Sequence, residues 1–314
     1  MQNNTQRLLE QFGKGLWLTD AGLETAMIFL EGIDLPQFAA FTLLDSAEGQ
    51  EALLRYNTSF LNEAKTLDAG FLLDTVTWRA SAGWGQVLGL TPAAIDQVNR
   101  TAVAQAKRLQ TDRSGNGQQI LINGVIGPHG DAYAPDQMLS AEDAENYHRR
   151  QVGVLAASGV DLITAMTLSS HDEAIGIARA AQAVNQPVAL SFTVETDGLL
   201  ISGMTLQEAI YRTDEATNGT PIWYGINCAH PDHFRHVLSG DWVHRIGSVR
   251  ANASRLSHAE LDDALQLDDG NIEELAQDYK KLLQLLPGLR VVGGCCGTDL
   301  RHLAAIGQSC LHLH

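Results

Sequence analysis

Three cysteines are the residues of this chain best suited to chemistry. Cys228 ends the stretch Tyr-Gly-Ile-Asn-Cys, and the adjacent pair Cys295 and Cys296 lies within Gly-Gly-Cys-Cys-Gly-Thr. Each group follows a short apolar run typical of a buried strand, and the glycines permit a turn there, so the thiols could meet at one point. Thiolates are good zinc ligands, and a site that does chemistry keeps its fourth position open. The wide spacing between Cys228 and the pair excludes a zinc finger or ribbon.

Other interpretations of these cysteines exist. Free cysteines are often small buried hydrophobes, and two of the three could form a disulfide. A cytosolic location argues against the disulfide. The glycines on both sides of the adjacent pair favour a metal site, because they let the strand end so that both thiols can face one ion. We interpret Cys310, which stands alone near the end of the chain, as a packing residue.

Composition narrows the class of protein. The 314 residues are 45% hydrophobic, and the net charge is −16 at pH 7. Nucleic-acid binding needs clustered Lys and Arg, so we expect no nucleic-acid partner. The polar N-terminus lacks the apolar core of a signal peptide, and no apolar run is long enough to span a membrane. We therefore expect a soluble cytoplasmic protein with no membrane partner.

Eight apolar runs alternate with segments of helical periodicity. The runs cover residues 16–19, 70–77, 120–126, 160–167, 188–194, 222–226, 246–251 and 289–292. The helical segments cover residues 48–67, 92–110, 141–158, 171–184, 205–213, 231–238 and 271–286. This alternation predicts an α/β fold, a (β/α)₈ TIM barrel that forms a single domain over residues 1–314. Ser140 and Thr91 are placed to cap the helices that follow them.

A barrel of this type gathers functional residues at the C-terminal ends of its strands. Residues just after each run should therefore face a common mouth. They are Asp20, Gly22, Glu24, Thr77, Trp78, Arg79, Gly127, His129, Met166, Thr167, Glu195, Asp197, Cys228, His230, Asn252, Ser254, Cys295 and Cys296. The three cysteines fall at this mouth, on strands six and eight. We interpret His230, His233 and His236 as one solvated helix face.

The chain resembles the zinc-dependent homocysteine S-methyltransferases, which include the betaine-, S-methylmethionine- and cobalamin-linked enzymes. The resemblance rests on residues 20–25 (Asp-Ala-Gly-Leu-Glu-Thr), 123–128 (Asn-Gly-Val-Ile-Gly-Pro), 225–228 and 293–298. It implies transfer of a methyl group from a sulfonium or quaternary ammonium donor to a thiol, with homocysteine giving methionine. It also implies that Cys228, Cys295 and Cys296 are catalytic through a bound Zn²⁺, and that the partners are a small-molecule thiol acceptor and a methyl donor.

The same resemblance implies a set of substrate-binding residues, namely Asp20, Ala21, Gly22, Trp78, Met166 and Asn252. Asp20 suits an ammonium, and the face of Trp78 suits a cationic donor. Two positions depart from the family pattern. Ala21 stands where the family usually has glycine, and Met166 stands where a glutamate of the fourth strand commonly pairs with the substrate amine. Glu195 and Asp197 are available to replace that glutamate.

Two alternatives to this function remain at the level of sequence. The first is a barrel enzyme that acts on a different thiol acceptor or uses its zinc for hydrolysis. The second is a non-catalytic zinc-binding barrel that stores or senses the metal. An enzyme should keep an open fourth position at the zinc, whereas a sensor should close it with a fourth protein ligand. The sequence does not identify the methyl donor and is compatible with a homo-oligomer.

Overall fold

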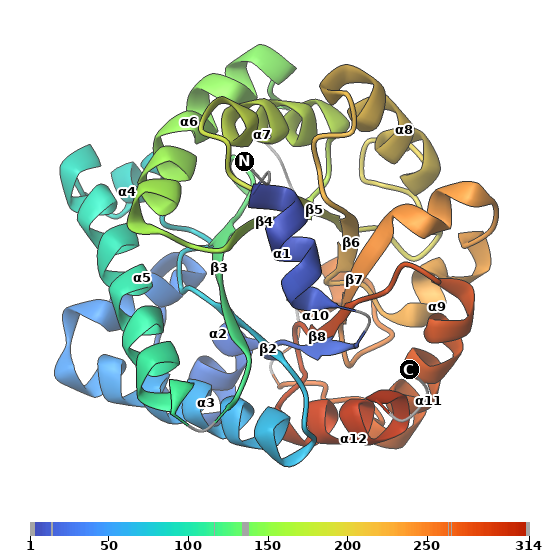
Figure 1. Cartoon of the computed structure of the whole chain (residues 1–314), viewed down its shortest axis with the longest axis horizontal. Helices are drawn as coiled ribbons and strands as arrows, with labels where there is room; N and C mark the ends of the chain where they lie inside the picture. The colour runs from blue at the N-terminus through green and yellow to red at the C-terminus, as the bar shows by residue number, and fades with distance from the viewer. Residues whose placement is uncertain are drawn as a thin grey trace.

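Eight parallel strands form a closed barrel in chain order, β1 to β8, which confirms the predicted (β/α)₈ fold (Figure 1). The computed structural model describes residues 4–13, 15–115, 117–133, 138–262, 264 and 266–311. The strands are β1 (Trp17–Leu18), β2 (Phe71–Asp74), β3 (Ile120–Ile126), β4 (Leu162–Leu168), β5 (Val188–Phe192), β6 (Tyr224–Asn227), β7 (Ile246–Ala251) and β8 (Val291–Gly294). Each lies at one of the eight predicted runs.

Most of the helices surround the barrel and cover the outward faces of the strands, while α1 lies across one end of it (Figure 1). They are α1 (Asn4–Phe12), α2 (Leu23–Thr25), α3 (Ala47–Thr66), α4 (Ala82–Val87), α5 (Pro92–Ser114), α6 (Ala141–Ser158), α7 (His171–Ala183), α8 (Leu206–Thr217), α9 (Pro231–Phe234), α10 (His258–Asp262), α11 (Ile272–Leu285) and α12 (Leu300–Cys310). The predicted caps of α5 and α6 are confirmed. Thr91 accepts a hydrogen bond from the amide of Ala94, and Ser140 accepts one from Asp143.

Helix α1 covers the end of the barrel at which the strands begin (Figure 1). Its residues Leu8 and Phe12 are buried in one cluster with residues near the starts of the strands, among them Leu72 of β2 and Leu162 of β4. The ring of Phe12 lies 4.9 Å from that of Trp17 and 5.0 Å from that of Trp223, measured between centroids. This apolar plug leaves the opposite end of the barrel, where the strands finish, as the accessible mouth.

Strand β4 is irregular where it reaches the mouth. Its pairing with β5 shifts register between Ala165 and Leu168, and Thr167 has a positive φ of 63°. Bulges of this kind re-aim side chains and are common beside active sites. Here the irregularity directs Met166 into the mouth, while its neighbours in the strand stay buried.

Among the described helices, none combines the length and the apolar character that crossing a bilayer requires.

Candidate functional site

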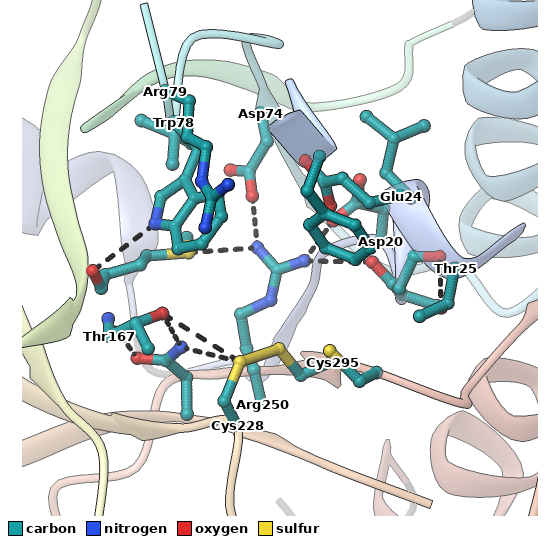
Figure 2. Close-up of a pocket in the computed structure, with 18 of the residues that line it drawn as sticks. Asp20, Glu24, Thr25, Asp74, Trp78, Arg79, Thr167, Cys228, Arg250 and Cys295 are labelled. Atoms are coloured by element: carbon teal, nitrogen blue, oxygen red, sulfur yellow. Dashed lines mark hydrogen bonds and ion pairs between the residues drawn. A yellow bond between two sulfur atoms is a disulfide. The ribbon is translucent and has the colours of Figure 1, made fainter. Parts of the chain in front are cut away.

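A cavity of about 300 Å³ opens at the C-terminal ends of the strands (Figure 2). Its described lining includes Asp20, Ala21, Gly22, Glu24, Thr25, Phe38, Asp74, Trp78, Arg79, Asp131, Tyr133, Met166, Thr167, Asn227, Cys228, Arg250, Cys295 and Cys296. Five of the six expected substrate-binding residues lie on this wall, together with the three cysteines. A concave site with thiols and several charged groups is a strong candidate for chemistry.

The three thiols lie together at the base of this cavity. The sulfurs of Cys228, Cys295 and Cys296 are within 4.8 Å of one another. Cys228 and Cys295 form a disulfide with a Cα–Cα distance of 5.4 Å, whereas Cys296 lies outside it. The disulfide is the arrangement that the sequence analysis disfavoured. It shows that the ends of β6 and β8 place these two side chains in direct contact.

The side chain of Asn227 orients Cys228. Its amide oxygen accepts a hydrogen bond from the Thr167 amide at 2.9 Å, and its Nδ2 donates to Thr167 Oγ1 at 2.8 Å and to Cys228 Sγ at 3.3 Å. Cys228 itself has a positive φ of 55°, a conformation that costs a non-glycine residue roughly 1–3 kcal/mol. A hydrogen bond from the buried Asn227 amide therefore helps to hold a strained cysteine in place.

Close backbone contact fixes the second part of the cluster. Gly22 lies against the Cys295 loop, and a Cβ at Gly22 would come within 2.5 Å of the Cys295 carbonyl oxygen. A Cβ at Gly293 would come within 2.6 Å of the Asp20 carbonyl oxygen. Only glycine permits both approaches, so the glycines of the first and last motifs let the β1 and β8 loops pack together beside the cysteines.

A buried arginine spans the cavity wall and was not singled out from the sequence. Arg250 of β7 forms ion pairs with Asp20, after β1, and with Asp74 at the end of β2 (Figure 2). Its Nε donates to the Gly294 carbonyl at 3.0 Å. Burial raises the pKa of Asp20 to about 7, and the Arg250 charge opposes that shift. The sequence does contain a signal for this ion-pair cluster. Asp74 is the single charged residue of β2, and Arg250 is the single charged residue of β7. A charged residue is rarely buried without a partner of opposite charge.

Met166 and Trp78 both line the cavity, as expected. Met166 Sδ lies 3.7 Å from Arg250 Nη1, and the Met166 carbonyl accepts a hydrogen bond from Trp78 Nε1 at 3.4 Å. Arg79 also lines the cavity, and its guanidinium carbon lies 5.0 Å from the centroid of the Trp78 ring and 4.0 Å from that of Trp84. An internal cation thus already uses part of the aromatic surface near the mouth.

Eight of the expected mouth residues are not among the described residues that line this cavity, namely Thr77, Gly127, His129, Glu195, Asp197, His230, Asn252 and Ser254. Asn252 is buried and donates to the Cys228 carbonyl at 3.1 Å, so it supports the thiol cluster from behind and is not part of the described cavity wall. Glu195 contacts His258 at 3.3 Å, and Asp197 accepts from the Leu199 amide at 3.0 Å. Neither acid is among the described residues that line the cavity, so neither is placed to replace the missing glutamate.

The interpretation of three histidines as a solvated face is wrong for two of them. His230 and His233 are 2% and 7% exposed, and only His236 faces solvent. His230 caps α9 by accepting a hydrogen bond from the Asp232 amide at 3.1 Å. Burial lowers its pKa to about 4. His230 also lies close to Asp232 and Asp278, but arginines already pair with both carboxylates.

Comparison with known proteins identifies relatives of this chain. A model of the homocysteine S-methyltransferase family matches residues 19–310. Selenocysteine methyltransferase from Astragalus bisulcatus is 28% identical over 57% of this chain and 55% of its own length. Homocysteine S-methyltransferase from Escherichia coli is 27% identical over 60% of this chain and 62% of its own length. The aligned part of the chain thus spans less than two thirds of these relatives.

Solved structures show the same fold over the whole chain. The homocysteine methyltransferase from Escherichia coli in its oxidized form superimposes with a TM-score of 0.76 and 21% identity, covering 98% of this chain and 99% of that one. Its metallated form gives a TM-score of 0.73 at 22% identity, with the same coverage. At this level of identity the likeness concerns the fold.

Proposed function

Because the chain belongs to the homocysteine S-methyltransferase family, we propose that it moves a methyl group from a sulfonium or quaternary ammonium donor to homocysteine, giving methionine. The observation that carries this proposal is the cluster of Cys228, Cys295 and Cys296 at the base of a cavity. Its acceptor and donor are small molecules, which suits a cavity of about 300 Å³.

The three cysteines have the donor set that a zinc ion requires. Sulfur is a preferred zinc ligand, and three protein ligands leave one position for substrate. Reduction of the Cys228–Cys295 disulfide would release two of the three thiols. No other His, Cys, Asp or Glu of the described chain joins the cluster. This open arrangement supports an enzyme and speaks against a barrel that stores or senses zinc through a closed site.

The chemistry follows from the state of the acceptor's sulfur. A free thiol has a pKa of about 8.5 and is mostly protonated at neutral pH, and zinc bound here would keep the acceptor as a thiolate. The thiol proton would pass to solvent on binding, and the sulfur would then form a bond to the methyl carbon while the bond from that carbon to the donor's sulfonium or ammonium atom breaks, so that the donor leaves as a neutral group. Holding the two reactants in line contributes on the order of 7–11 kcal/mol to the acceleration.

The residues around the cysteines have separate tasks in this scheme. Asn227 donates to Cys228 Sγ and is thereby placed to hold this sulfur toward the other two cysteines. Trp78 offers its ring to the cationic donor, for which Arg79 competes because its guanidinium lies over the same ring. Thiolate ligands persist in a reducing compartment, so we place the enzyme in the cytoplasm.

The proposal can be tested on the purified, reduced protein. Zinc content is measured first, and the zinc–sulfur coordination is then followed by X-ray absorption during a titration with L-homocysteine. Three bound sulfurs that become four would support the mechanism. Bound zinc whose coordination homocysteine leaves unchanged would contradict the acceptor, and failure to bind zinc would contradict the metal site.

A further inference from the structure

The cavity contains four described acidic side chains, and they differ in what they already bind. Asp74 uses both oxygens, because Oδ1 accepts from Asn123 Nδ2 at 2.7 Å and Oδ2 pairs with Arg250. Asp131 is 3.7 Å from Arg79 and accepts from the amide of Tyr133. Asp20 gives one oxygen, Oδ1, to Arg250. These three carboxylates are therefore wholly or partly committed to groups of the protein.

Glu24 is the exception among these acids. It lies in the first turn of α2 and is half-buried in the cavity wall. Within the part of the chain that the structure describes, no other side chain forms an ion pair or hydrogen bond with its carboxylate. The second oxygen of Asp20 likewise has no hydrogen-bond partner among the described residues. Figure 2 shows both residues on one side of the Arg250 guanidinium, with Trp78 and Arg79 on the other.

The balance of charge in the cavity favours a cation at this place. Arg250 has one positive charge for the two carboxylates that it contacts, Asp20 and Asp74. Glu24 adds a third carboxylate to this wall, and burial raises its pKa because its ionised form has lost part of its hydration. Met166, at the end of β4, provides only a thioether, which is a weak acceptor. A partly buried carboxylate without a partner is stabilised by a cationic group of a ligand.

We infer that Glu24 binds the α-ammonium group of the acceptor amino acid, beside Asp20, which the family resemblance already assigns to this amine. This inference rests on the proposed function and names the residue that takes over amine recognition where β4 carries Met166. Arg250 is then a positioning residue, because it holds Asp20 and Asp74 without using its own charge on the substrate.

The test compares two thiols that differ only in the amine. Zinc-reconstituted, reduced protein is titrated by calorimetry with L-homocysteine and with 4-sulfanylbutanoate, which has the same chain, thiol and carboxylate but no ammonium. We expect Glu24→Gln to weaken homocysteine binding about 30-fold or more, as loss of a partly desolvated charge pair does, and to change binding of 4-sulfanylbutanoate less than about threefold. The variant should fold normally because Glu24 makes no polar contact to another described side chain, and circular dichroism checks this.

Glu31→Gln is the matched control. Glu31 follows a π-helical turn, Ala26–Leu30, that continues directly from α2. Its side chain is 44% exposed and paired with Arg55, and it is not among the described residues of the cavity wall. It should leave both affinities unchanged. An equal loss for both thiols in Glu24→Gln would mean that the residue has a structural role, and no loss for either would also overturn the inference. A wild-type protein that binds neither thiol would refute the proposed function itself, and the assignment of Glu24 with it.

Discussion

Substitution of Asn227 tests how the protein holds the Cys228 sulfur for metal binding. Its side chain makes three hydrogen bonds, two to Thr167 and one to the sulfur of Cys228. Leu and Asp both match its shape, but they remove different parts of this set. Leu removes all three bonds, whereas Asp keeps an acceptor for the Thr167 amide and loses the donor to sulfur. Asp alone also places a negative charge next to the sulfur, so the two variants should differ in zinc affinity.

Both Asn227→Leu and Asn227→Asp should lower stability by about 3 kcal/mol, for different reasons. For Leu, three hydrogen bonds at about 1 kcal/mol each give this loss, because Thr167 is 1% exposed and its amide would find no water. Asp retains acceptors for the amide and hydroxyl of Thr167, but it places a carboxylate among neutral groups at a position that is 2% exposed. Urea unfolding of the reduced, metal-free protein at pH 7.5 measures both values.

Zinc affinity should separate the two variants. Leu removes one donor to the Cys228 sulfur, for which we expect about a tenfold loss. Asp removes the donor and adds a negative charge 3.3 Å from the sulfur, where two unit charges repel by about 5 kcal/mol at an effective dielectric constant near 20. We expect a loss of at least about a hundredfold, measured by competition with a chromophoric chelator. If Asn227→Asp binds zinc as tightly as the wild type or as Asn227→Leu, this account of Asn227 is wrong.

Three further predictions concern other parts of the molecule. Cys295→Ser should reduce zinc affinity at least about a hundredfold, whereas Cys310→Ser, in α12, should still bind one equivalent of zinc. One equivalent of tightly bound zinc in Cys295→Ser would exclude the three-cysteine zinc site. Gly22→Ala should lower stability by about 1–3 kcal/mol and weaken zinc binding, because the new Cβ would meet the Cys295 carbonyl. Gly15→Ala is the control, since a Cβ at Gly15 meets open space, and equal melting temperatures of the two variants would refute this prediction. His230 has a folded pKa of about 4 against about 6.5 when unfolded, so its contribution is present above pH 6.5 and is lost as the pH falls. At pH 5 the wild type should have lost about 2 kcal/mol of unfolding free energy that His230→Asn retains, and parallel pH profiles in urea unfolding would contradict it.

The sequence alone predicts the fold because each strand and helix is encoded locally. The runs at residues 120–126 and 246–251 match β3 and β7 without change, since buried parallel strands are continuous apolar stretches between turn residues. The alternation of these runs with helical periods leaves a barrel as the natural closure. The approach of the three cysteines follows from the same logic, because residues after successive strands must meet at one end. The family relationship adds the expected metal and substrate.

The tertiary structure decides how charges are shared across the barrel, which no local pattern encodes. Arg250 meets Asp20 and Asp74 from strands far apart in the chain, and that contact determines which carboxylates are committed. The same limit explains the errors for Glu195 and His230, whose surroundings depend on how distant loops and helices pack. Burial and pairing are properties of three-dimensional neighbours. The sequence therefore determines which strand ends meet at the mouth, and only the folded barrel determines which side chains line it and which of them, such as Glu24, remain available to a ligand.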